Sequence, residues 1–182
     1  MQIYGLYGKS GTGKSYKCLE VVFANQIDAV IDDGILIIDR VHVAGKSAKC
    51  EKLLYSATKR AIFQSDDHCC REVADFIHMK KEITKILILG TSKRMIQKIA
   101  TRLDLPTEIE WIPIETVQLK DELLLARKYR EEGYHVIPIQ PVQVEKTYRG
   151  WSKNIPIQLS DRIVEVILIR PFDFRASDVK PN

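Results

Sequence analysis

The sequence predicts an α/β fold of three layers, in which a mainly parallel β-sheet lies between helices. Three observations favour this class. Short apolar runs typical of buried parallel strands recur along the chain, as at residues 3–7 and 85–90. Amphipathic segments alternate with them, and a glycine-rich loop joins the first run to the first such segment. The 182 residues are enough for one domain with a sizeable core. We divide them into a main domain, 1–145, and a C-terminal extension, 146–182, that we expect to pack on the same domain.

The glycine-rich loop carries the strongest motif in the chain. It has the form G-x-x-x-x-G-K-S of the phosphate-binding P-loop, or Walker A motif, and reads Gly8-Lys9-Ser10-Gly11-Thr12-Gly13-Lys14-Ser15. Glycines allow backbone angles that a Cβ forbids, so successive N–H groups can turn inward around a phosphate. We expect all eight residues to bind a nucleoside triphosphate, with Lys14 against the β- and γ-phosphates and the Ser15 hydroxyl on Mg²⁺. A Gly/Ser turn that matches the motif by chance is the alternative.

The flanks of this loop have the secondary structure that the motif requires. Residues 3–7 are predicted to form a short buried strand, and residues 15–25 a helix with Cys18, Leu19 and Phe23 on one face. The N-terminus of that helix would point its dipole at a bound anion.

A β-hairpin is predicted directly after the first helix. Two apolar runs, 27–31 and 35–39, flank Asp33-Gly34, which is a strong hairpin-turn signal. A right-handed crossover makes the first run parallel to strand 3–7, so its C-terminal end lies beside the glycine-rich loop. The second run leads back from the loop.

Three aspartates compete for the role of metal-binding acid. By pattern alone Asp39 fits best, because four apolar residues precede it. The hairpin geometry leaves Asp39 about 15 Å from the loop at ~3.3 Å per residue, whereas Asp32 and Asp33 lie at the loop side. We therefore favour Asp32 as the Mg²⁺ ligand beside Ser15, and Asp33 as the catalytic base or water-positioning group. A plain turn role for Asp33 stays open.

Residues 8–15, the following helix with Leu19-Glu20, and the segment 29–33 resemble the start of bacterial HPr kinase/phosphorylase. That family pairs a Walker A loop with a hydrophobic-Asp-Asp segment at a similar distance. The resemblance covers residues 8–33, and it implies Mg²⁺ coordination and base-like roles for Asp32 and Asp33. More broadly, the sequence is similar to small bacterial ATP-binding proteins of the P-loop NTPase superfamily.

Residues 48–81 are predicted to form a helical insertion, as a lid over the nucleotide or as plain packing. One helix is expected from Ala48 to about Gln64, after an N-cap at Ser47, and a second from about Asp67 to Lys81. The first helix carries a basic face, which we expect to be solvated, formed by Lys49, Lys52, Lys59 and Arg60. A second anion site at Gly45-Lys46-Ser47 is the alternative.

The clearest buried strand, residues 85–90, ends at Thr91 and Ser92. The C-terminal edge of a parallel sheet faces the ligand crevice, so Thr91 or Ser92 is a candidate sensor of the γ-phosphate. Capping of helix 93–103 by Ser92 uses the same geometry and stays equally open.

The later chain is predicted more coarsely. We expect an edge strand at 108–114, an amphipathic helix at 118–132 that exposes Arg130, a strand at 134–139 and a final strand at 163–169. In a parallel strand, His135 would lie opposite the loop, so we assign it a structural role. Basic and aromatic residues alternate over 146–153, which suits nucleic-acid contacts or packing of an ordered tail. From Arg170 onward we expect a linker or frayed end.

Composition limits the alternatives without choosing among them. The net charge of +4 permits nucleic-acid binding but does not argue for it. No apolar run approaches the roughly 18 residues of a membrane span, and the chain enters a strand at once, so we expect a cytoplasmic protein without a signal peptide. The four cysteines form no C-x-x-C pair and are expected to be reduced thiols: Cys18, Cys50, Cys69 and Cys70.

Together these features predict a Mg²⁺-dependent ATP-binding protein, an ATPase or phosphotransferase with Lys14 and Asp33 as catalytic residues. A nucleotide-dependent switch and a nucleic-acid-associated ATPase, both with little intrinsic turnover, are the alternatives. No residue in the pattern selects ATP over GTP, and neither a protein nor a small-molecule acceptor is identified. The oligomeric state is also open, because a neighbouring subunit could supply an arginine to the site.

Overall fold

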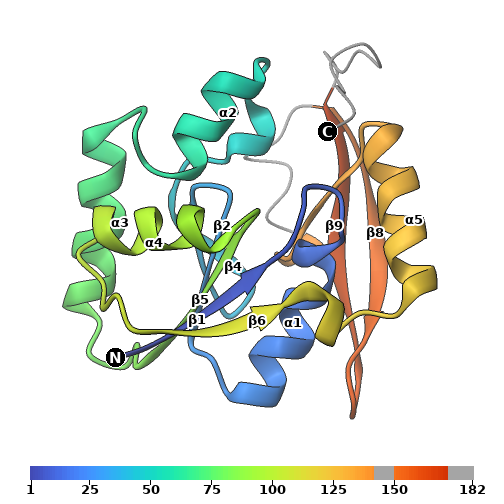
Figure 1. Ribbon diagram of the computed structural model, residues 1–182. Coiled ribbons are helices and arrows are strands. Elements are labelled where there is room, and N and C mark those ends of the chain that lie inside the picture. Colours follow the sequence, from blue (N-terminus) through green and yellow to red (C-terminus); the bar gives the residue numbers. More distant parts are fainter. Residues whose placement is uncertain (142–149, 172–182) are drawn as a thin grey trace.

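The computed structural model describes residues 1–141 and 150–171 and shows an α/β fold around a mixed, mainly parallel sheet (Figure 1). Its six strands lie in the order β4-β3-β2-β5-β1-β6. Their bounds are β1 Gln2–Tyr7, β2 Ala29–Asp32, β3 Ile35–Ile38, β4 Val41–Gly45, β5 Lys85–Gly90 and β6 Ile109–Pro113. The pairs β1–β5, β1–β6 and β2–β5 are parallel, while β2–β3 and β3–β4 are antiparallel. The predicted fold class is thus confirmed at this level.

The C-terminal ends of β1, β5 and β2 lie at one edge of this sheet. Tyr7 pairs with Gly90 across β1 and β5, and Ile31 pairs with Ile88 across β2 and β5. The loop after β1, Thr91 after β5 and Asp32 at the end of β2 therefore meet at this edge. This is the edge at which open α/β sheets bind ligands.

Helices cover one face of the sheet. The helices among the described residues are α1 Lys14–Asn25, α2 Leu54–Ala61, α3 Asp67–Met79, α4 Lys93–Arg102 and α5 Lys120–Glu131, with short 3₁₀ turns η1 Ala48–Cys50 and η2 Ile114–Thr116. α3 and α4 bury Val73, Ile77, Ile96 and Ile99 against the sheet on one side. Ser92 caps α4, since its Oγ accepts a hydrogen bond from Met95 N at 3.2 Å.

A second, three-stranded antiparallel sheet covers the other face together with α1 (Figure 1). It has the order β7-β9-β8, with bounds β7 His135–Ile137, β8 Gly150–Gln158 and β9 Ile163–Pro171. Its Ile157, Val166 and Ile169 share one core with Tyr4 and Leu6 of β1. The C-terminal strands β8 and β9 therefore contribute to the core that packs against the central sheet.

This second sheet corrects two predictions. The strand predicted at 134–139 does not join the central parallel sheet; it pairs antiparallel with β9. The segment 150–153, read as part of a basic-aromatic tail, is the start of strand β8, and Arg170 lies within β9. The rest of that basic-aromatic run, 146–149, and the tail from 172 lie outside the described residues. β9 pairs with both β7 and β8, so the long apolar strand at 163–171 organises both neighbours.

The insertion 48–81 also differs from its prediction. The single helix expected from Ala48 to about Gln64 is broken, because Glu51 and Leu53 adopt extended backbone angles between η1 and α2. Leu53 and Leu54, at the break before α2, are each 67% exposed. On α1, Phe23 likewise remains 40% exposed instead of joining Cys18 in the core.

Within residues 1–141 and 150–171, no helix combines the length and the apolar content needed to cross a bilayer.

Candidate functional site

The glycine-rich loop between β1 and α1 forms the floor of the candidate site. Gly11 and Gly13 have φ angles of 73° and 82°, in the left-handed region where a Cβ is strained. The bend is held from behind, since Thr12 Oγ1 donates to Lys9 O at 2.7 Å and Gly8 N donates to Gly90 O at 3.3 Å. The motif therefore folds into a rigid bend tied to the end of β5.

Lys14, the first residue of α1, folds back over this bend. Its Nζ donates to Gly8 O at 2.7 Å and to Lys9 O at 2.8 Å. Burial lowers the pKa of Lys14 to about 8, against the opposing pull of the nearby Asp33 and Asp32. The positive charge of Lys14 is therefore only partly compensated by the nearby carboxylates. An anion bound at the loop would stabilise the charged form of this side chain.

The hairpin after α1 delivers two carboxylates to the loop. Asp32 ends β2 and is buried, and its Oδ2 accepts a hydrogen bond from Ser15 Oγ at 2.8 Å. Asp33 and Gly34 have φ angles of 48° and 87°, as a two-residue hairpin turn requires. Asp39 lies at the other end of β3, where its carbonyl accepts from Gln140 Nε2 at 3.1 Å. Of the three candidate acids, Asp32 and Asp33 are brought to the loop and Asp39 is not.

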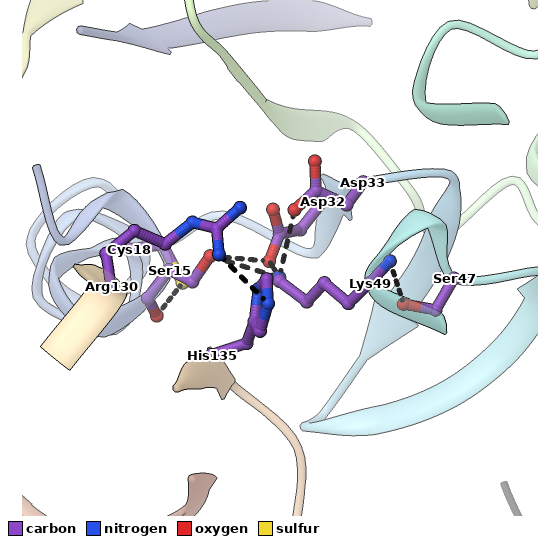
Figure 2. Close-up of polar contacts among 8 residues, drawn as sticks. All are labelled: Ser15, Cys18, Asp32, Asp33, Ser47, Lys49, Arg130 and His135. Atoms are coloured by element: carbon purple, nitrogen blue, oxygen red, sulfur yellow. Dashed lines mark hydrogen bonds and ion pairs between the residues drawn. The ribbon is translucent and has the colours of Figure 1, made fainter. Parts of the chain in front are cut away.

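Lys49 is the functional residue that the sequence pattern concealed (Figure 2). Its Nζ lies 2.6 Å from Asp32 Oδ2, 3.2 Å from Asp33 Oδ2 and 3.2 Å from Ser15 Oγ. The side chain is only 6% exposed, so its assignment to a solvated basic face was wrong. Burial raises the pKa of Asp32, although Lys49 opposes the effect. Lys49 holds the pKa of Asp33 below its usual value despite burial, which acts to raise it.

Backbone contacts to the hairpin turn explain why Lys49 reaches the site. Ala48 N donates to Asp33 O at 2.7 Å, and Lys46 N donates to Gly34 O at 3.1 Å. Ser47 Oγ accepts from Lys49 N at 3.2 Å, so the expected capping serine starts a 3₁₀ turn instead of a long helix. The Gly45-Lys46-Ser47 segment, which the sequence also offered as a second anion site, directs the amides of Lys46 and Ala48 at the carbonyls of the hairpin turn.

α5 and the segment before it pack on the open side of the loop. A Cβ on Gly11 would lie 3.1 Å from Arg130 Cγ, and a Cβ on Gly13 would lie 2.5 Å from Gln118 Nε2. α5 is tied to α1 by Lys17, a buried side chain on α1 whose Nζ pairs with Glu122 at 2.9 Å. This contact places the exposed basic residue predicted at Arg130 directly beside the loop.

His135 lies at the site, contrary to the prediction that it would sit opposite the loop. Arg130 Nη1 is 3.2 Å from His135 Nε2. Burial, with help from Arg130 and Lys49, lowers the pKa of His135 to about 3. The prediction failed because β7 belongs to the antiparallel second sheet, where strand direction in the central sheet does not apply.

These residues surround a cavity of about 470 Å³. Eight of the predicted site residues line it: Ser10, Gly11, Gly13, Lys14, Ser15, Asp32, Asp33 and Thr91. The other predicted loop residues, Gly8, Lys9 and Thr12, shape the loop from behind and are absent from the wall. The cavity is also lined by apolar side chains of α2, α4 and α5, among them Leu54, Ala57, Met95, Leu125 and Tyr129. The size falls in the range of small-molecule sites.

Gln118 lines this cavity and carries a buried polar atom without a protein partner among the described residues. Gln118 is 8% exposed, and its Oε1 accepts no hydrogen bond from the part of the chain that the structure describes. An unpartnered buried acceptor at a cavity wall is stabilised when a ligand donor reaches it.

Comparison of the chain with protein-family models, with curated proteins and with solved structures finds no match.

The donor set at the loop is compatible with a magnesium ion. Mg²⁺ takes oxygen ligands, and one or two carboxylates suffice when phosphate oxygens and water complete its shell. Ser15 Oγ and Asp32 Oδ2 supply such a pair. The described ranges contain no group of three or more His, Cys, Asp or Glu side chains arranged as an all-protein metal site. The two oxygens of Ser15 and Asp32 therefore suit a metal ion whose other ligands come from the phosphates of a bound ligand.

Proposed function

We propose that the cavity binds Mg²⁺–ATP and that the protein hydrolyses the nucleotide or transfers its γ-phosphoryl group. One observation carries this proposal: the hydroxyl of Ser15, at the start of α1, meets the carboxylate of Asp32 at 2.8 Å beside a glycine bend. This arrangement supports the proposal, because phosphoryl transfer requires a loop that would hold the phosphates next to oxygens that would bind the metal.

The loop residues would bind the phosphates. Amides in the bend and the N-terminus of α1 present positive ends of dipoles, and Lys14 adds a full charge. Thr91 lies at the end of β5 on the cavity wall, where it would contact the terminal phosphate. Mg²⁺, when bound by Ser15 and Asp32, would neutralise charge on the phosphate oxygens.

Two further side chains fit the chemical step. Asp33 has 38% of its side chain exposed and lies on the cavity wall, so its carboxylate can orient an attacking water or acceptor hydroxyl. Arg130 lies beside the loop in the same chain and would stabilise charge on the transferring group. The arginine that the sequence left to a neighbouring subunit is therefore available within one chain.

The apolar wall gives space for a nucleobase or for an acceptor, and it excludes water when filled. A regulatory switch with little turnover is the second candidate. It is favoured by Lys49, which already neutralises the acids that turnover would use.

The test measures binding and turnover in parallel. We expect titration calorimetry to detect Mg²⁺–ATP binding to the wild type and to lose it in Lys14→Ala. The matched control is Lys98→Ala, which removes an exposed lysine on α4. Phosphate release by the wild type supports an enzyme, whereas tight binding without release supports the switch. Unchanged affinity in Lys14→Ala would overturn both.

Release is also measured with added RNA or DNA. Strong stimulation would favour the nucleic-acid-associated ATPase over the other two functions.

A further inference from the structure

The ammonium of Lys49 stands where a divalent cation would bind. It contacts Asp32 Oδ2 at 2.6 Å and Ser15 Oγ at 3.2 Å, and these two oxygens are 2.8 Å apart. Adjacent ligands of an octahedral Mg²⁺ at 2.0–2.1 Å are separated by about 2.9 Å. The two oxygens are joined by a hydrogen bond, yet the same spacing would let them serve as adjacent ligands of such a metal, and the chain supplies its own cation to them.

We propose that Lys49 is a tethered cation that holds the divalent-cation position in the resting protein and excludes free Mg²⁺ from it. The metal enters when a nucleotide arrives with it, because the phosphates offer the displaced ammonium a new partner. The part of this inference that concerns the nucleotide rests on the proposed function. The competition between Lys49 and a divalent cation does not depend on it.

Charge and burial explain why a resident cation is needed. Asp32 is almost fully buried, and an unpaired carboxylate there is strongly unfavourable. Lys14 is engaged with the carbonyls of Gly8 and Lys9, so Lys49 is the ammonium that lies in contact with Asp32. A metal that bound to Asp32 and Ser15 would have to displace the Lys49 ammonium, which contacts both of these oxygens.

The backbone around Lys49 permits such an exchange without unfolding. η1 is tied to the hairpin turn through Ala48 N and Asp33 O at 2.7 Å, which keeps the lysine at the site. Its flexible stem of four methylenes then lets the ammonium move a few ångströms toward a phosphate.

The experiment measures metal binding without nucleotide, with Mn²⁺ as the probe and electron paramagnetic resonance as the readout. We expect Lys49→Met to bind Mn²⁺ roughly tenfold or more tightly than the wild type, because a tethered competitor acts at millimolar effective concentration. Lys98→Met, which removes an exposed lysine from α4, serves as the control and should leave the affinity unchanged. The double variant Asp32→Asn/Lys49→Met should lose this gain in Mn²⁺ affinity, because the metal then lacks its carboxylate ligand. A purely structural role of Lys49 predicts no gain in either variant.

The outcomes separate this inference from the proposed function. If folded Lys49→Met binds Mn²⁺ no more tightly than the wild type, the tethered cation is refuted even when Mg²⁺–ATP binds. If the wild type binds no nucleotide but Lys49→Met gains Mn²⁺, the competition stands and the proposed function fails. Lys49→Gln provides a second variant with a polar side chain. If neither single variant folds in millimolar Mg²⁺, the metal cannot replace the lysine and the inference is overturned.

Discussion

The guanidinium of Arg130 lies 3.2 Å from Nε2 of His135, and both side chains face Asp33 (Figure 2). A guanidinium only donates hydrogen bonds, so Nε2 must accept and the imidazole carries its proton on Nδ1. A neutral histidine thereby holds a cation of α5 beside the glycine-rich loop. This pair connects the second sheet to the site that the central sheet forms.

Replacement of Arg130 should affect turnover more than binding. For Arg130→Ala we expect single-turnover phosphate release to fall by about 100-fold or more, since such arginines act mainly on the transition state. The affinity for Mg²⁺–ATP, measured by calorimetry, should change by less than about tenfold. Arg127→Ala removes an exposed arginine from the same helix and is the control. Equal losses in both variants would refute a specific role for Arg130.

His135 should make stability depend on pH. With its pKa lowered to about 3, the folded chain leaves His135 neutral, whereas the unfolded chain protonates it below about 6.5. Its contribution to stability is therefore complete above pH 6.5 and is lost as the pH falls toward 3. We expect His135→Gln to reduce the loss of unfolding free energy between pH 7.5 and pH 5 by about 1 kcal/mol, given its partial exposure.

Urea unfolding at the two pH values measures this difference. His68→Gln, at an exposed position on α3, should keep the wild-type pH dependence. A His135→Gln variant as sensitive to acid as the wild type would contradict the assignment.

The two aspartates should separate stability from chemistry. Asp32→Asn removes one partner of a buried ion pair and should lower the unfolding free energy by about 3 kcal/mol, with Asp33 still facing Lys49. Asp33→Asn should cost less than about 1 kcal/mol, because asparagine tolerates a positive φ and the side chain is partly exposed. It should nevertheless abolish phosphate release while nucleotide binding persists. Similar stability losses in the two variants would show that their environments do not differ as described.

Gln118 should behave as a ligand-binding residue and not as a structural one. Gln118→Met removes the unpartnered buried amide at similar length, so we expect unchanged stability or a gain of up to about 1 kcal/mol. The affinity for Mg²⁺–ATP should fall by about tenfold, because the ligand loses one hydrogen-bond acceptor. Thermal unfolding and calorimetry measure the two effects, with the exposed Gln97→Met as the control. A destabilised Gln118→Met with unchanged affinity would reverse the interpretation.

Local features of the fold could be predicted because their causes are local. The glycine bend at residues 8–13, the Asp33-Gly34 turn and the choice of Asp32 over Asp39 all follow from backbone angles, chain direction and strand length. The capping of α3 by Asp66 also has a local cause, since Asp66 Oδ1 accepts a hydrogen bond from Cys69 N at 3.0 Å. Chain direction and strand length also allowed the sequence to predict that Ser15 and Asp32 lie together, although they are 17 positions apart in the chain.

The tertiary structure decided which further side chains surround the glycine bend and the hairpin turn. Lys49 looked like one lysine of a solvated helix face, and only the bonds from Ala48 and Lys46 to the hairpin turn bury it beside Asp32. His135 and Arg130 reach the loop because β7 pairs with β9 and because Lys17 holds α5 through Glu122. Periodicity describes how a segment alternates between apolar and polar residues, but it carries no information on which distant strand or turn that segment meets. The sequence by itself therefore determined the glycine-rich bend with Lys14 and the two carboxylates beside it, whereas long-range pairing determined that Lys49 and Arg130 also surround them.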